Sequence, residues 1–105
     1  MIIAVDIDGT LCTTHGTDYA GAQPIPHRIA RINALYEAGH TIVLWTARGS
    51  GTGVDHHELT RCQMNSWGVM YTELRVGNPG GKIPFDLFID DRAVNAASYF
   101  EGGDW

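Results

Sequence analysis

MIIAVDIDGT, residues 1–10, is an apolar run that changes abruptly into a polar one. The apolar part is continuous, short and rich in β-branched residues, so residues 2–7 are predicted to form a strand buried on both faces. Two carboxylates, Asp6 and Asp8, come at the end of this strand. Burial raises the free energy of an ionised carboxylate and neighbouring carboxylates repel each other, so this strand end requires a positive partner.

A second apolar run, near the end of the chain, finishes in the same way. Residues 86–90 (DLFID) are predicted to form another buried strand, and Asp91 follows directly after it. Lys82 lies eight residues before Asp90. Carboxylate oxygens suit a hard ion such as Mg²⁺, and protein Mg²⁺ sites usually hold a substrate phosphate as well. The two acidic strand ends therefore predict one Mg²⁺ ion held by Asp6, Asp8, Asp90 and Asp91.

Strands and helices alternate along the rest of the chain. Pro24 and Pro26 are predicted to open a helix that Gly39 ends. The other expected elements are strands over 41–45 and 69–71, a helix begun by a capping box of Asp55 and Glu58 and ended by Gly68, a last helix over 93–99, and loops over 8–23 and 46–53.

This alternation, with strands that are apolar throughout, predicts an α/β fold. We expect one domain over residues 1–105, a three-layer α/β/α Rossmann-like core with a small parallel sheet of four to five strands. Polar groups of such sheets collect in the crevice at the carboxyl ends of the strands. Asp6, Thr46 and Asp90 each end or follow a strand, so their side chains are expected to converge on one rim.

Composition limits the partners of the protein. Seven Lys and Arg residues stand against twelve Asp and Glu, and the basic residues form no cluster in the sequence. This argues against extended nucleic acid, which is bound mainly through phosphate contacts. No apolar run is long enough to span a membrane, and the N-terminus lacks the features of a signal peptide. With two cysteines outside any metal-type spacing, we expect a cytoplasmic protein with reduced thiols.

The converging residues suit phosphoryl transfer. Asp6 is expected to attack phosphorus and form an aspartyl-phosphate, since aspartate is a known nucleophile in such reactions. Asp8, with a raised pKa when protonated, is expected to protonate the leaving oxygen and later to deprotonate the attacking water. Thr46 and Lys82 would stabilise the phosphoryl oxygens. The expected catalytic residues are thus Asp6, Asp8, Thr46 and Lys82.

These residues resemble the four motifs of the haloacid dehalogenase superfamily of phosphatases. The resemblance covers D-I-D-G-T from Asp6, a Thr after the second strand, a Lys, and then D-D at Asp90. It implies that the backbone carbonyl of Asp8 also binds the metal. It leaves open which of Asp90 and Asp91 ligates the ion directly. Beside the motif residues we expect substrate contacts from Gly9, Thr10, Ala47 and Arg48. The likeness supports Arg48 in particular, because similar polynucleotide 3′-phosphatases carry an arginine at this place in T-A-R that meets phosphate.

A narrower likeness concerns W-T-A-R-G and F-D-L-F-I-D-D-R-A-V-N, which look like small phosphatases of capsule and polysaccharide biosynthesis. Those proteins are implied to act on phosphorylated sugars, polyols or related metabolites. The extra glycines of G-N-P-G-G-K-I-P leave Asn78 as an alternative for the lysine position, and Lys82 is preferred for its offset to Asp90. Neither usual place for a cap domain holds an insertion, so the chain resembles capless members. An open crevice of this kind either admits a large substrate or is closed by a neighbouring subunit of a homo-oligomer, a dimer or a tetramer.

The expected function is therefore a Mg²⁺-dependent hydrolase of a small phosphate monoester. One alternative is a phosphatase of nucleotides or nucleic-acid ends, which the I-D-D-R stretch also resembles. A second is a non-enzymatic phospho-acceptor like the receiver domains of response regulators. Receivers place their acidic pair after the first strand and a lone acceptor Asp later, whereas here D-x-D-G-T comes first. This order disfavours the second alternative.

Overall fold

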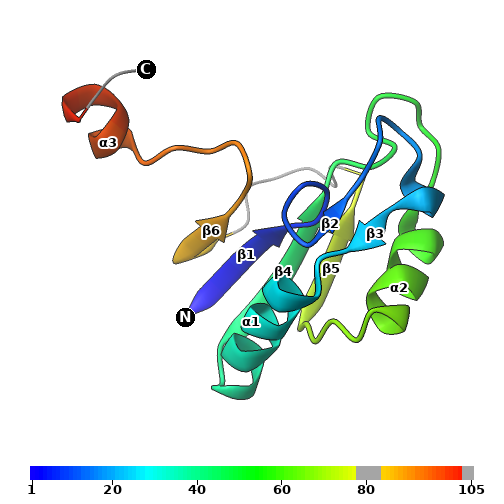
Figure 1. The fold of residues 1–105 in the computed structure, drawn as a ribbon, viewed down its shortest axis with the longest axis horizontal. Helices are drawn as coiled ribbons and strands as arrows, with labels where there is room; N and C mark the ends of the chain where they lie inside the picture. The colour runs from blue at the N-terminus through cyan, green and yellow to red at the C-terminus, as the bar shows by residue number, and fades with distance from the viewer. Residues whose placement is uncertain (78–83, 103–105) are drawn as a thin grey trace.

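A four-stranded parallel sheet forms the centre of the protein in the computed structural model, which describes residues 1–77 and 84–102 (Figure 1). The strand order is β5-β4-β1-β6. The strands are β1 (Ile2–Asp6), β4 (Thr41–Thr46), β5 (Glu73–Val76) and β6 (Leu87–Ile89). Helices flank this sheet, so the predicted α/β class is confirmed. No cap domain is evident among the described residues.

The register of the sheet brings the polar strand ends together. In β1, Asp6 lies opposite Trp45 of β4, and Val5 lies opposite Ile89 of β6. Because the strands are parallel, the residue after each of these partners lies at the same edge of the sheet. Thr46 and Asp90 therefore flank the end of β1, although they come from distant parts of the chain.

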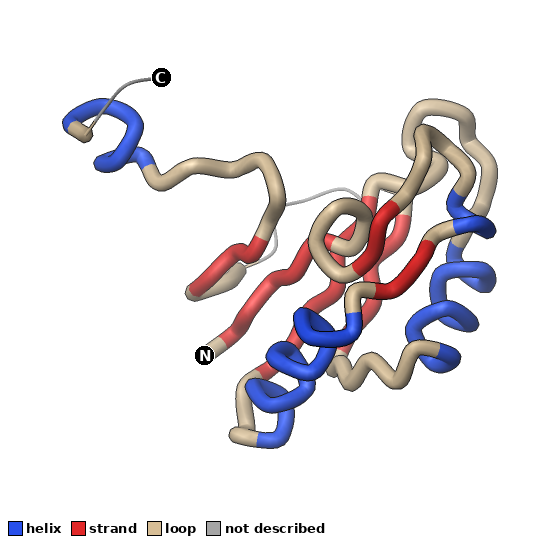
Figure 2. The backbone as a smooth tube through the Cα atoms, in the orientation of Figure 1, coloured by secondary structure: helices blue, strands red, loops and turns tan. Residues whose placement is uncertain are grey.

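Helices α1 (Pro26–Glu37) and α2 (His57–Ser66) pack against β4 and β5 respectively (Figure 2). Pro26 occupies the first turn of α1, where its missing N–H costs no hydrogen bond, and Gly39 follows the helix with a φ of 98°. The apolar faces of both helices meet the sheet in one core of buried residues, which includes Ile3, Val5, Ile29, Ile32, Ile42, Leu44 and Met64. The helix predicted after Pro24 and Pro26 is thereby confirmed.

The strand predicted over residues 69–71 is displaced along the chain. Val69 is buried, but its N–H donates to Met64 O at the end of α2, and Met70 N–H donates to the side chain of Asn33. The chain joins the sheet only at β5, with the sequence ELRV. This strand lies at the sheet edge and pairs with β4 alone, so it tolerates charged residues that a central strand would exclude.

The expected capping box of α2 is also wrong. Asp55 Oδ1 accepts a hydrogen bond from His57 N–H, but the N-cap is His56 and Glu58 does not reach back to it. Glu58 instead forms an ion pair with Arg61, one turn further along. The last helix, predicted over 93–99, is α3 (Ala96–Glu101), because the side chain of Asn95 caps its first turn. This helix stands away from the sheet (Figures 1 and 2).

The loop predicted over 8–23 contains short elements of its own. Strands β2 (Cys12–Thr13) and β3 (Gln23–Pro24) form a small antiparallel pair, with the 3₁₀ turn η1 (Tyr19–Gly21) between them. Two-residue strands leave no periodic signal in a sequence, which explains why they were not predicted. Among the described residues, no helix combines the length and the apolar character that a membrane crossing requires.

Candidate functional site

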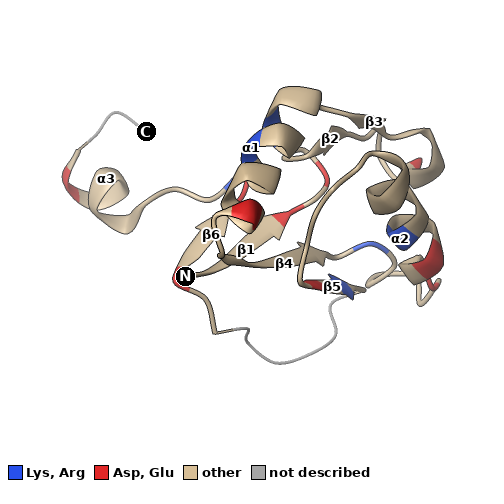
Figure 3. Cartoon of the chain, turned by 90° about the horizontal axis from the view of Figure 1, so that it is seen from below, with Lys and Arg blue, Asp and Glu red and all other residues tan. Residues whose placement is uncertain are grey.

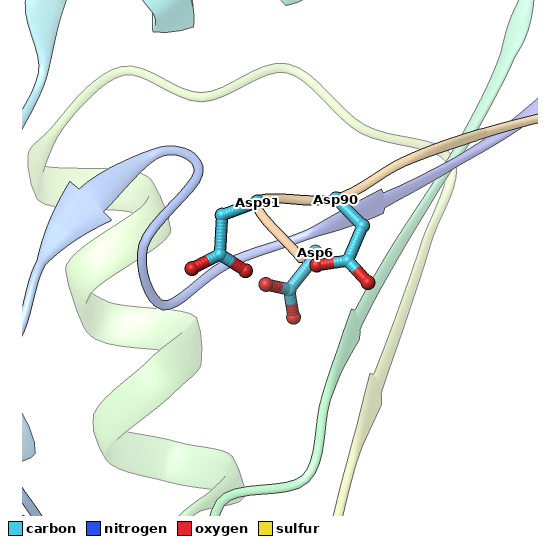
Figure 4. A group of neighbouring side chains, drawn as sticks. All are labelled: Asp6, Asp90 and Asp91. Carbon is cyan, nitrogen blue, oxygen red and sulfur yellow. The ribbon is translucent and has the colours of Figure 1, made fainter. Parts of the chain in front are cut away.

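Three carboxylates from the two ends of the chain meet at the carboxyl edge of the sheet. Asp6 ends β1, and Asp90 and Asp91 directly follow β6. One ligand atom of each residue lies within 4.8 Å of those of the other two, and Figure 4 shows the three carboxyl groups gathered in one place. Asp6 and Asp90 are half-buried and Asp91 is exposed. The structure thus brings together three of the four predicted metal ligands.

The three-carboxylate cluster has the chemistry that a hard divalent cation requires. Its donors are carboxylate oxygens close enough for one ion to contact all of them. Burial, together with the repulsion of Asp90 and then Asp91, raises the pKa of Asp6 from 3.8 to about 6. Burial makes the ionised form of Asp6 costly, and the two neighbouring carboxylates add a repulsion that a bound cation would offset. The residues present therefore fit a hard divalent cation, which would be held by Asp6, Asp90 and Asp91.

Asp8 faces a different set of partners. Its Oδ1 accepts hydrogen bonds from Thr14 Oγ1 at 2.7 Å and Arg48 Nη2 at 2.8 Å, and its Oδ2 accepts from Arg48 Nε at 3.0 Å and Thr46 Oγ1 at 3.2 Å. The side chain of Asp8 is still 26% exposed. Its carboxylate is not a member of the three-carboxylate cluster, contrary to the expectation that all four would share one ion. Whether its backbone carbonyl binds a metal stays a prediction.

The pKa of Asp8 departs from the expectation as well. Burial by itself would raise it, but the hydrogen bonds from Arg48 and Thr14 outweigh burial, and the pKa of Asp8 is lowered. We expected a raised pKa for Asp8 because an acid must be protonated before it can give a proton to the leaving oxygen. Hydrogen bonds from Arg48, Thr14 and Thr46 stabilise the ionised form instead.

Arg48 is directed into the protein. Only 1% of the residue is exposed, and beside its hydrogen bonds to Asp8 it donates through Nη1 to Thr60 Oγ1 and Gln63 Oε1. Its guanidinium also lies 4.9 Å from the centre of the Tyr19 ring. We expected Arg48 to bind the substrate phosphate, and in this arrangement its donors are used by protein groups. The burial of a charged side chain is compensated by these hydrogen bonds and by the ion pair with Asp8.

The other predicted substrate contacts lie around the same edge. Ala47 is exposed and Thr46 is 1% exposed, with its hydroxyl donating to Asp8. Thr10 Oγ1 is 3.5 Å from Asp6 Oδ2, so it contacts the expected nucleophile itself. Arg28 was not predicted; it donates through Nη1 to the carbonyls of Gly9 and Thr10, which fixes the turn after β1. Lys82 and its alternative Asn78 lie outside the described residues.

Gly9 occupies a position that no other residue fits without strain. Its φ is +84°, a conformation that L side chains rarely adopt, and an added Cβ would lie 2.2 Å from Asp91 Oδ2. The absence of a side chain at Gly9 therefore allows the turn after β1 to approach Asp91 closely.

We expect Gly9→Ala to displace Asp91 and to destabilise the protein by about 1–3 kcal/mol, the range for a residue held in a strained conformation. Chemical denaturation measures this change. Gly51→Ala is the matched control, because a Cβ there meets nothing within 4 Å, and its effect should stay within about 0.5 kcal/mol. Equal stabilities of the two variants would show that the close approach of Gly9 and Asp91 is unimportant.

An open cavity of about 780 Å³ lies above the cluster. The turn around η1 forms one wall, and the glycine-rich loop after β4 forms another. The lining includes Asp6, Asp8, Thr17, Tyr19, Ala47, Ser50, Thr52, His56, Asp90, Asp91 and Arg92. Lys and Arg residues are spread over several elements of the described chain and do not gather at one face (Figure 3). The cavity thus combines an acidic floor with walls that carry hydroxyl and aromatic groups.

Sequence reasoning missed the polar residues that surround Asp8. Thr14 was treated as part of a plain loop, and Thr60 and Gln63 as ordinary helix residues, yet all three bind Asp8 or Arg48. A signal did exist, since Thr60 and Gln63 lie three residues apart and share a helix face with buried Met64. Polar side chains on a buried helix face need a polar partner, and Arg48 is that partner.

Solved structures similar to this chain support the fold. A protein target from Vibrio cholerae is 28% identical, with a TM-score of 0.66 over 94% of this chain and 87% of that one. A conserved protein from Bacteroides thetaiotaomicron is also 28% identical, with a TM-score of 0.62 over 90% of this chain and 78% of that one. No protein-family model and no curated protein matches the chain.

Proposed function

We propose that this protein is a Mg²⁺-dependent phosphatase of the haloacid dehalogenase type that hydrolyses a small phosphate monoester through an aspartyl-phosphate on Asp6. The observation that carries the proposal is the three-carboxylate cluster, Asp6, Asp90 and Asp91, at the floor of an open cavity. Asp8, beside it, keeps a partly exposed carboxylate fixed by Arg48. A bound Mg²⁺ ion supplies positive charge that neutralises the carboxylates and the phosphate oxygens.

The first half-reaction belongs to Asp6. One of its carboxylate oxygens attacks phosphorus, the bond between phosphorus and the ester oxygen breaks, and the leaving oxygen takes up the proton that Asp8 carries from the preceding turnover. Its position at the end of β1 favours this role, since the backbone of a central strand fixes the direction of attack. Thr10 Oγ1, 3.5 Å from Asp6 Oδ2, helps to orient the nucleophile.

Asp8 serves the second half-reaction. Water attacks the phosphorus of the aspartyl-phosphate and gives a proton to Asp8, the bond to Asp6 breaks, and inorganic phosphate leaves. The donors around Asp8 favour its ionised form, which is the form that a base requires. The proton taken up in one turnover is then available for the leaving oxygen of the next. Asp8 can therefore act as the acid expected from the sequence, because it has gained a proton as the base in the preceding turnover.

The cavity walls favour a sugar or polyol phosphate as substrate. Thr17, Ser50 and Thr52 carry hydroxyl groups at the cavity, and these can exchange hydrogen bonds with the hydroxyls of a neutral leaving group. Arg48, which could have met a second phosphate, is occupied by Asp8 and α2. The open cavity also leaves room for a second subunit of a homo-oligomer to complete the site, which the resemblance to capless members implies.

A substrate panel tests this proposal. Purified protein with Mg²⁺ is expected to release phosphate from sugar and glycerol phosphates at least about tenfold faster, in kcat/KM, than from 3′- and 5′-nucleotides, a difference of about 1.4 kcal/mol in transition-state stabilisation. Phosphate release is measured by colorimetric assay. A preference for nucleotides would favour the alternative substrate class. A phosphorylated protein that does not turn over would favour the receiver-like alternative.

A further inference from the structure

Arg48 connects the carboxylate of Asp8 to two elements outside the reaction centre. On one side its Nε and Nη2 donate hydrogen bonds to Asp8, at 3.0 Å and 2.8 Å. On the other, its Nη1 donates to Thr60 Oγ1 at 3.2 Å and to Gln63 Oε1. Both acceptors belong to α2 and are buried, at 0% and 8% exposed. Asp8 therefore binds one edge of the guanidinium, and α2 binds the other edge.

Gln63 has a second bond that ties the cavity wall to the same group. Its Nε2 donates to Tyr19 O at 2.6 Å, at the start of η1, while its Oε1 accepts from Arg48. The Tyr19 ring lies over the Arg48 guanidinium, and His56 packs edge-on against that ring with centroids 5.0 Å apart. Both polar atoms of the Gln63 side chain are therefore hydrogen-bonded, Oε1 to Arg48 after β4 and Nε2 to Tyr19 in η1.

These contacts matter because a free carboxylate rotates. A base must present a lone pair to the attacking water within hydrogen-bond reach, and a misplacement of about 1 Å can cost about 10²-fold in rate. Asp8 lies in the turn after β1, so the backbone alone does not fix its side chain. A planar guanidinium that donates two parallel hydrogen bonds does so, provided that the guanidinium cannot itself move.

We propose that Thr60 and Gln63 are positioning residues, which hold Arg48 and through it orient Asp8 for deprotonation of the water that hydrolyses the aspartyl-phosphate. The inference rests on the proposed function and adds to it a part played by α2. Neither residue touches the reacting atoms, and both act through Arg48. Gln63 also fixes the position of η1 relative to Arg48 and Asp8, through its hydrogen bond to Tyr19 O.

Pre-steady-state kinetics with 4-nitrophenyl phosphate tests this inference. Its leaving group needs no proton, so the first half-reaction does not depend on Asp8, while the second does. In Gln63→Met and Thr60→Val we expect a burst of nitrophenolate close to one per active site, followed by a steady state slowed about 10–100-fold. This is less than the full contribution of a general base, about 10²–10⁴-fold, because Asp8 itself is still present. Because only the second step slows, kcat and KM should fall together and kcat/KM should stay within about twofold.

Two further variants separate positioning from stability. Thr60→Ser keeps the hydroxyl and should behave like the wild type, and Asn65→Met, exposed on the same helix, is the matched control for Gln63→Met. A variant that merely unfolds in part would show a smaller burst and an unchanged KM. NMR exchange of the Arg48 Nε proton shows whether α2 holds the guanidinium, and we expect faster exchange in Gln63→Met and Thr60→Val only.

The possible failures are distinguishable. If the wild type hydrolyses phosphate monoesters, but neither α2 variant shows a burst or faster Arg48 exchange, the inference is overturned while the proposed function stands. If the wild type releases no phosphate from any monoester in the presence of Mg²⁺, the proposed function itself fails and the catalytic part of the inference fails with it.

Discussion

Replacement of Asp6 by Asn is expected to lower kcat by roughly 10⁴-fold or more, the scale seen when a catalytic nucleophile is removed. The amide has nearly the volume of the carboxylate but cannot attack phosphorus. Phosphate release from the best substrate of the panel measures the change. Glu37→Gln, which removes one negative charge at the exposed end of α1, is the matched control and should keep the wild-type rate.

Asp6→Asn should also make the protein more stable than the wild type when no divalent cation is present. Ionisation of Asp6 is unfavourable in the folded state, where its pKa is about 6 against 3.8 in the unfolded chain. Its contribution to stability is therefore lost as the pH rises from about 4 to 6. Asn carries no charge, so Asp6→Asn should melt at a higher temperature than the wild type at pH 8 in EDTA. A variant that is both inactive and less stable than the wild type would point to misfolding.

The second large effect concerns Mg²⁺. At a concentration about tenfold above its Kd, Mg²⁺ should stabilise the folded protein by about 1.4 kcal/mol and raise Tm by about 5–10 °C. The reason is that bound Mg²⁺ offsets the mutual repulsion of Asp6, Asp90 and Asp91, whose ligand atoms lie within 4.8 Å of one another. Thermal melts followed by circular dichroism with and without Mg²⁺ measure the shift.

The Mg²⁺ shift should depend on pH and on the cluster. Protons compete with the ion for Asp6, so the shift should be larger at pH 8 than at pH 5. The effect of Asp8 on folding stability has the opposite pH dependence to that of Asp6. Its lowered pKa adds stability that is lost only as the pH falls below about 3.8. Asp90→Asn should reduce the shift and Glu37→Gln should not. An equal shift in both variants would place the ion elsewhere.

The parts of the fold that sequence reasoning predicted well are those with a single physical signal. The central strand β1 and its neighbour β4 are apolar throughout because other elements cover them, and α1 shows both helical periodicity and a proline start. β5 gave no such signal, since an edge strand accepts Glu73 and Arg75 among its four residues. Buried Val69 in the segment before it was mistaken for the strand.

The acidic residues of the site were predictable for a different reason. Asp6 ends an apolar strand and Asp90 directly follows another, and parallel strands bring their ends to one edge whatever the loops do. The environment of Asp8 depends instead on side chains from a turn, a loop and a helix, including Thr14, Arg48 and Gln63. Contacts of this kind depend on how α2 packs beside the sheet, which periodicity does not determine.

Chemical trapping detects the aspartyl-phosphate on Asp6 itself. Protein in steady-state turnover is quenched in acid, reduced with borohydride and digested, which converts an aspartyl-phosphate into homoserine that mass spectrometry detects. We expect homoserine at position 6 and at no other aspartate. Homoserine at Asp8, Asp90 or Asp91, or full turnover without any homoserine at position 6, would contradict it.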